Sequence, residues 1–261
     1  MKRITTLTLS ALLWLPAIAN AAQCTATSSE RRVPLLELYT SEGCDSCPPA
    51  DRWLSALPER GYSSDRVVAL AFHVDYWNDL GWVDPYAHKR YSERQHHIAA
   101  RNQSRAVYTP QFTLNGRDYR RGALRDDFGE HIAALQQQKP QASLRLALTM
   151  APDSVTARGS ATIADAGERP LAQTWIALYE NKLATEVKSG ENRGKRLAHD
   201  FVVRDIAGPL PADAQGKVDL GHRFTIDPRW KIRDLAVAAF VQNVKTGDVL
   251  QALALGCTPV R

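Results

Sequence analysis

The chain has 261 residues, of which 44% are hydrophobic, and it carries a formal net charge of +5. This length and composition predict a globular protein with one large domain or two small ones, each with its own core. The basic residues are spread along the chain without long runs, which excludes the charge pattern of a nucleic-acid-binding or lipid-surface protein.

Residues 1–22 have the three regions of a secretory signal peptide: a basic start, an apolar run from Leu7 to Ala19, and the small-residue site Ala19-Asn20-Ala21. The apolar run is shorter than the roughly 20 residues that a membrane helix needs. The sequence therefore predicts a periplasmic or secreted protein whose mature chain has no membrane span.

Four cysteines in an exported chain indicate an oxidising compartment, in which cysteine pairs persist as disulfides. Cys44 and Cys47 form one natural pair because only two residues separate them. Cys24 and Cys257 remain, one near each end of the mature chain, and we expect a structural disulfide between them. The polar residues 23–32 show no periodicity and are expected to form a tail that is held only by Cys24.

The first half of the mature chain alternates predicted strands and helices. The apolar run 33–40 predicts a buried strand, and Pro48-Pro49, directly after the second cysteine, suits the first turn of a helix. A second apolar run, 66–74, predicts a strand parallel to the first. The Cys44-x-x-Cys47 dithiol thus lies where a strand runs into a helix, and the helix N-terminus stabilises a thiolate on Cys44.

An insert rich in aromatic and acidic residues, 75–85, follows the second strand. Parallel strands deliver their C-terminal loops to the same edge of a sheet, so Asp75, Trp77 and Trp82 are predicted on the rim of the dithiol pocket. The alternative is that both tryptophans pack the insert into the core. A polar helix over 86–104, a hairpin that contains Pro110 and Asn115-Gly116, and an amphipathic helix over 124–138 are expected next.

Beyond Lys139-Pro140 the hydrophobic pattern changes to period two. Short alternating runs, such as 144–148, 155–163 and 235–241, are separated by turns and show no helical period. This pattern predicts an antiparallel sandwich-like arrangement for 140–261.

The order of elements in the first half resembles the thioredoxin fold, in which a cis proline lies against the dithiol and offers its backbone to an extended peptide. Thr109-Pro110 occupies that place here. The segments Glu37 to Asp51, Phe72 to Trp77, Leu80 to Pro85, Tyr179 to Asn181 and Gly190 to Asn192 resemble the secreted thioredoxin-like family catalogued as domain of unknown function 1223. The expected fold class is therefore an α/β thioredoxin-like domain over 23–139 followed by an antiparallel all-β domain over 140–261.

The dithiol favours a thiol–disulfide oxidoreductase that acts on protein or peptide thiols and disulfides without a cofactor. Cys44 is expected to be the solvent-facing nucleophile and Cys47 the resolving thiol. Thr109, Pro110, Glu42, Asp75, Trp77 and Trp82 are the expected substrate-binding residues. Glu42 and Asp45 add negative charge that opposes the effect of the helix end on the thiolate, so the direction of electron flow stays open.

Two other functions remain open. One is a binding module that holds a peptide in its groove, or holds copper through Cys44 and Cys47 with a histidine or carboxylate of the insert. The other is a purely structural role for both disulfides. A zinc site is disfavoured because the chain has no second close cysteine pair.

Overall fold

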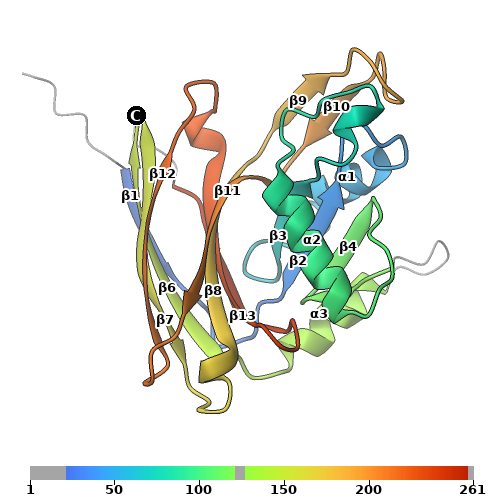
Figure 1. Cartoon of the computed structure of the whole chain (residues 1–261). Helices are drawn as coiled ribbons and strands as arrows, with labels where there is room; N and C mark the ends of the chain where they lie inside the picture. Colours follow the sequence, from blue (N-terminus) through green and yellow to red (C-terminus); the bar gives the residue numbers. More distant parts are fainter. Residues whose placement is uncertain (1–21, 121–126, 258–261) are drawn as a thin grey trace, which may run out of the picture.

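The computed structural model describes residues 22–120 and 127–257, so the predicted signal peptide lies almost entirely outside the described part (Figure 1). The α-helices in this part are α1 (Pro48–Ser55), α2 (Lys89–Arg101) and α3 (Phe128–Gln136). The strands are β1 (Ala22–Thr27), β2 (Leu35–Thr40), β3 (Val68–His73), β4 (Gln111–Leu114), β5 (Arg117–Asp118), β6 (Ala142–Ala151), β7 (Ser154–Ile163), β8 (Ala172–Glu180), β9 (Leu183–Glu186), β10 (Arg196–His199), β11 (Val202–Pro211), β12 (Lys217–Thr225), β13 (Leu235–Asn243) and β14 (Val249–Leu255).

The strands form three sheets. An eight-stranded mixed sheet has the order β14-β13-β8-β11-β3-β2-β4-β5, a four-stranded antiparallel sheet has the order β1-β6-β7-β12, and β9 and β10 form a separate hairpin. Within the large sheet β2 and β3 are parallel, and β11 joins β3 in parallel through the pair Val202 and Ala71. Strands from both sides of Pro140 therefore share one continuous sheet.

The predicted fold class is wrong. The protein is mostly β, with 41% strand and 17% helix, and its large mixed and antiparallel sheets are not those of an α/β thioredoxin-like domain. The physical reason is that β3 is not an edge strand: β11 pairs with it and extends the sheet into β8, β13 and β14. These four strands were expected in a separate antiparallel domain, whereas in the described part of the chain the purely antiparallel sheets are the one formed by β1, β6, β7 and β12 and the β9–β10 hairpin. The division at 139/140 itself stays a prediction.

The N-terminal tail was also predicted wrongly. Residues 22–27 form β1, which pairs with β6 from Ala22 opposite Met150 to Thr27 opposite Arg145. The predicted disulfide between Cys24 and Cys257 is confirmed. It ties β1 to the residues just after β14.

Each face of the large sheet is covered by a different layer. Tyr91 and Ile98 of α2 pack on one face, against residues such as Phe72 and Phe240. On the opposite face, α1 and α3 cover β2, β3 and β4, while the four-stranded sheet covers β8, β13 and β14. Figure 1 shows this division, with the four-stranded sheet on the left and the helices on the right.

The predicted strands and the predicted helix around the cysteines are present in the structure. All six residues of β2 and all six of β3 are buried, as expected for continuous apolar runs between two layers. Helix α1 begins with Pro48 directly after its N-cap residue, Cys47. Helix α2 begins at Lys89 and not at residue 86, because the side chain of His88 caps it by accepting a hydrogen bond from Arg90 N–H.

In the described part of the chain, no helix has both the length and the apolar character that crossing a membrane requires. The structure contains two disulfides, which are typical of proteins from an oxidising compartment.

Candidate functional site

The Cys44–Cys47 disulfide lies between the end of β2 and the first turn of α1. The turn is built by Ser41, whose carbonyl accepts from Cys44 N–H and whose hydroxyl accepts from Gly43 N–H at 3.0 Å. Both cysteines have 0% exposed surface. The expectation that Cys44 faces solvent is therefore wrong for the oxidised protein.

A loop from the second half of the chain covers this turn. Residues 187–195 connect β9 to β10, and we call them the covering loop. The side-chain amide of Asn192, which is fully buried, donates hydrogen bonds of 2.8 Å to the carbonyls of both Glu42 and Cys44. Glu191 accepts from Asp45 N–H at 3.1 Å. The covering loop thus covers Cys44 from one side through hydrogen bonds to the backbone of the disulfide turn.

The aromatic insert supports the same turn from another direction. A Cβ on Gly43 would lie only 3.2 Å from the Cβ of Trp77, so Gly43 allows the tryptophan to pack against the disulfide turn. Trp77 donates to the hydroxyl of Thr109 at 2.8 Å, and Trp82 donates to Glu42 at 2.9 Å. Asp75 instead bonds the hydroxyl of Ser92 on α2, and no described contact joins it to the disulfide turn.

Five buried ionisable side chains lie beneath the turn, and we call them the acid–histidine cluster: Glu42, Asp51, His73, Asp84 and His199. His73 Nδ1 lies 2.7 Å from Asp84 Oδ2, and His199 Nε2 lies 3.1 Å from Glu42 Oε1. The two imidazole rings meet edge to face, with centroids 5.0 Å apart. His73 Nε2 and His199 Nδ1 have no hydrogen-bond partner among the described residues, although Asp51 lies 3.9 Å from His199 Nδ1.

Within the acid–histidine cluster, the pKa values of Asp51 and Asp84 shift in opposite directions. Burial raises the pKa of Asp51, and the nearby histidines offset this only in part. Burial also acts to raise the pKa of Asp84, but the interaction with His73 and the backbone N–H groups of Glu42 and Tyr86 outweighs it and lowers that pKa. Burial opposes protonation of His73, yet the Asp84 carboxylate outweighs burial and raises the pKa of His73.

Asp51 is the member of the acid–histidine cluster that shares the first turn of α1 with Cys47. Its N–H donates to the carbonyl of Cys47 at 3.1 Å, one helical turn back, and side chains four residues apart are neighbours on a helix. The hydroxyl of Thr40 lies 3.3 Å from its carboxylate. The cluster therefore places an acid that protonates more readily than usual beside the second cysteine.

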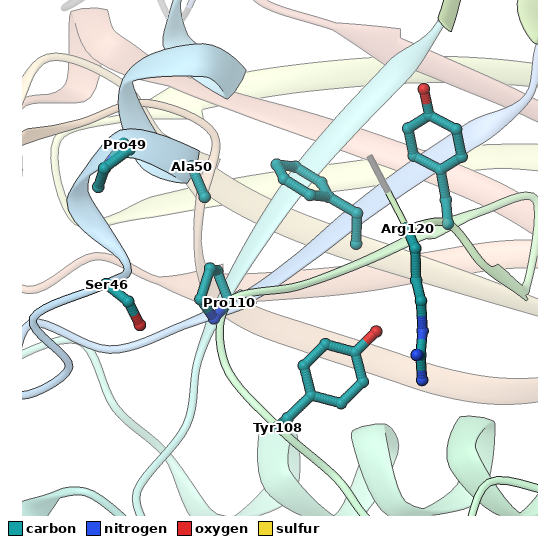
Figure 2. A pocket seen from close by; sticks show the side chains of 8 residues that line it. Ser46, Pro49, Ala50, Tyr108, Pro110 and Arg120 are labelled. Carbon is teal, nitrogen blue, oxygen red and sulfur yellow. The ribbon is translucent and has the colours of Figure 1, made fainter. Parts of the chain in front are cut away.

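A pocket of about 460 Å³ opens beside Ser46, which lies between the two cysteines and contacts Cys44 Sγ at 3.4 Å. Its lining comes from α1 with the turn before it, and from the segment on either side of β4: Ser46, Pro49, Ala50, Tyr108, Pro110, Phe112, Tyr119 and Arg120. Figure 2 shows Ser46 and Pro49 on one side of this pocket and Tyr108 and Arg120 on the other, with Pro110 between them. The Thr109–Pro110 peptide bond is cis, as predicted.

Four members of the site were not predicted from the sequence: Asn192, His199, Asp84 and Asp51. His73 at the end of an apolar strand was a usable signal, since an ionisable residue there reaches the sheet edge. Asn192 lies in the Gly190 to Asn192 segment that resembles the family, but nothing in that segment indicates contact with the cysteines. His199 carries no local signal, because β10 reaches the site only through the tertiary fold. Glu42 was expected to bind substrate, but it is buried with both oxygens engaged by Trp82 and His199.

The sequence left open a copper site at Cys44 and Cys47. Among residues 22–120 and 127–257 no group of three or more histidine, cysteine, aspartate or glutamate side chains is arranged to hold a metal ion.

Residues 35–242 match the family model described as "Protein of unknown function (DUF1223)". The structure is similar to that of protein AGR_C_4864 from Agrobacterium tumefaciens, with a TM-score of 0.60 and 26% identity over 89% of this chain and 98% of that one. It is also similar in fold to HBP35 of Porphyromonas gingivalis, with a TM-score of 0.67 and 19% identity over 88% of this chain and 76% of that one. No curated protein matches the sequence.

Proposed function

Since the chain belongs to the DUF1223 family of proteins of unknown function, we propose a function for it from its own site: a periplasmic or secreted thiol–disulfide oxidoreductase that works through Cys44 and Cys47. The observation that carries this proposal is the disulfide at the first turn of α1, next to an open pocket and above the acid–histidine cluster. Helix N-termini stabilise thiolates, which supports opening of the bond at this position.

The proposed reaction transfers two electrons through a mixed disulfide. A substrate thiolate attacks Cys44 Sγ, the Cys44–Cys47 bond breaks, and Cys47 leaves as a thiolate that takes up a proton. A second substrate thiolate then attacks the substrate sulfur of the mixed disulfide, and Cys44 leaves with its electron pair. The substrate dithiol is oxidised to a disulfide and the protein is reduced; the reverse sequence reduces a substrate disulfide.

Asp51 is the residue that we assign to the proton of Cys47. It follows Cys47 by one helical turn, and its carboxylate forms no ion pair with lysine or arginine among the described residues. Its raised pKa brings its proton affinity nearer to that of a thiol, which favours exchange between the two groups. His199, whose Nδ1 lies 3.9 Å from Asp51, is the next group to which the proton can move.

The buried state of Cys44 favours a second candidate, a binding module that uses the pocket without redox turnover. The two candidates differ in whether the disulfide opens in the folded protein. A bond that is reduced only when the chain unfolds would assign the pocket to binding.

The test is equilibration of the folded protein with glutathione buffers, followed by alkylation and mass spectrometry. We expect Cys44 and Cys47 to be reduced while Cys24 and Cys257 stay bridged, because the second pair joins two strand regions distant in sequence. Reduction of both pairs together, only under unfolding conditions, would contradict the proposal.

Trapping identifies which cysteine attacks. Cys47→Ser is expected to accumulate mixed disulfides on Cys44 in a periplasmic extract, whereas the matched variant Cys44→Ser is expected to accumulate none. Equal, low trapping by both variants, with no exchange by the unmodified protein, would rule out turnover.

A further inference from the structure

We propose that the pocket beside Ser46 is a specificity subsite that binds an aromatic or large aliphatic side chain next to the reacting cysteine of a substrate polypeptide. This inference rests on the proposed oxidoreductase function and names its substrate class. It is carried by the position of the pocket, by its lining and by the way in which Cys44 is covered.

The first step concerns access to Cys44. On one side the covering loop holds the turn through two 2.8 Å hydrogen bonds from buried Asn192 to backbone carbonyls. On the other side the hydroxyl of Ser46 lies 3.4 Å from Cys44 Sγ, and Ser46 also lines the pocket. A rotation of one exposed serine side chain costs far less than displacing a hydrogen-bonded loop. A substrate sulfur therefore reaches Cys44 from the pocket.

The second step concerns what the pocket accepts. The walls are the rings of Tyr108, Phe112 and Tyr119, together with Pro49 and Pro110. Phe112 is itself fixed by an edge-to-face contact with Trp53, with ring centroids 5.1 Å apart. Walls of this kind stabilise an apolar or aromatic group by excluding water from it. The volume of about 460 Å³ lies within the range of small-ligand pockets and holds a large side chain with adjoining backbone.

The third step concerns the rim. Tyr108 donates to Asp118 at 2.9 Å, and Gln111 donates to the same oxygen at 2.8 Å. Arg120 bonds the other oxygen of Asp118 at 3.0 Å and lies over the ring of Tyr108 at 5.5 Å. This network holds the Tyr108 ring in place as a wall of the pocket. Glutathione offers no apolar side chain for such walls, so the occupant is a polypeptide and not that small thiol.

Binding is tested apart from chemistry with two labelled peptides that carry serine in place of the reacting cysteine. One has phenylalanine beside that serine and the other has alanine. Fluorescence anisotropy with the oxidised protein is expected to show about tenfold or tighter binding of the phenylalanine peptide. Equal affinities would overturn the proposal.

Two variants of one wall residue locate the preference. Tyr108→Ala removes the ring and is expected to abolish the difference between the two peptides. Tyr108→Phe keeps the ring, loses the bond to Asp118, and is expected to retain most of the difference. Folding of both variants is checked by circular dichroism, and a preference that survives in folded Tyr108→Ala would place the site elsewhere. If Tyr108→Ala does not fold, Pro49→Asp replaces it, at an exposed lining residue in the first turn of α1. The added charge is expected to abolish the preference for the phenylalanine peptide, and an unchanged preference would overturn the proposal.

Chemistry separates the two proposals. Cysteine-containing versions of both peptides and glutathione are compared in their rate of exchange with Cys44–Cys47. Faster exchange with the phenylalanine peptide supports the subsite. Exchange with glutathione and both peptides at one rate would overturn the subsite and leave the oxidoreductase proposal standing. Peptide binding without any exchange would overturn both, because the pocket would then serve a binding module.

Discussion

Two buried acids flank the cysteines in the sequence, and their neighbours give them different roles. Glu37 in β2 receives a 2.7 Å ion pair from Arg94 and contacts Tyr39 and Thr113, so it is neutralised within the core. The Asp51 carboxylate contacts Thr40 and His199, and no lysine or arginine of the described residues forms an ion pair with it. This difference is why the proton of Cys47 is assigned to Asp51.

Replacing Asp51 by asparagine is expected to slow the attack of Cys47 on the mixed disulfide, in the direction that reduces a substrate disulfide, by about 100-fold, the usual size of a general acid–base effect. Because burial raises the pKa of Asp51, the rate in the unmodified protein should rise with pH as this acid loses its proton. The variant should lack that rise. The measurement is a pH–rate profile followed by acid quench and mass spectrometry.

The matched control for Asp51→Asn is Glu37→Gln, which alters a buried acid of the neighbouring strand. It is expected to lower stability but to keep the shape of the profile, because Glu37 is paired with Arg94. An unchanged profile in Asp51→Asn would remove that residue from the reaction.

The His73–Asp84 pair makes a second prediction, about stability and pH. The folded-state pKa of His73 is raised, so its contribution is fully present below the unfolded value of about 6.5 and is lost as pH rises through the folded value. Asp84→Asn leaves His73 buried without its partner and is expected to cost about 3–5 kcal/mol at acidic pH. Urea denaturation should show a larger loss near about pH 5.5 than near about pH 8.5. An equal loss at both pH values would mean that the pair is not ionised in the folded state.

At the scale of elements, patterns within about twenty residues were informative and longer-range pairings were not. The buried runs that became β2 and β3, and the two prolines that begin α1, carry their signal locally. Strand β1 has a polar sequence and becomes a strand only because β6 offers it a partner more than a hundred residues away. Such a long-range pairing does not require an alternating hydrophobic pattern in β1 itself, so the sequence of β1 does not reveal it.

One pair of glycines tests the four-stranded sheet. A Cβ on Gly159 in β7 would lie 1.9 Å from the carbonyl oxygen of Arg145 in β6, so Gly159→Ala is expected to destabilise the protein by at least about 2 kcal/mol. Gly221 in the adjacent strand β12 has open space around its Cβ position. Gly221→Ala is expected to be neutral or to stabilise by about 0.4–1 kcal/mol. Thermal unfolding of both variants decides this, and similar losses would contradict the close approach of β6 and β7.

At the scale of the whole molecule, the sequence divided the chain at a change of hydrophobic period, whereas the large sheet continues across that change. The join depends on β11 beside β3, where Val202 pairs with Ala71. Both strands are apolar enough to occupy a sheet centre or an edge, and only tertiary packing decides between these. The same join brings the covering loop and His199 to the cysteines, which is why Asn192 and His199 were not predicted.

The Cys24–Cys257 disulfide closes a loop across a sequence separation of 233 residues. On the loop-closure model such a bond stabilises the folded state by about 4–5 kcal/mol, mainly by restricting the unfolded chain. The double variant Cys24→Ser/Cys257→Ser is expected to unfold at a lower urea concentration, with a free energy of unfolding lower by about 4–5 kcal/mol. It is expected to keep the exchange activity of Cys44–Cys47. A double variant as stable as the original protein would show that the paired strands β1 and β6 already supply the constraint.

Asn192 lies 148 residues after Cys44, and this separation sets an order of assembly. A chain that emerges from its N-terminus first presents Cys44 and Cys47 before the residue that shields them has been made. Its two thiols are neighbours from the start, so they can pair early and without guidance from the rest of the fold. The covering loop packs over Cys44 only when the later half of the chain docks. The Cys44–Cys47 bond is therefore more reactive in an unfinished chain than in the folded protein.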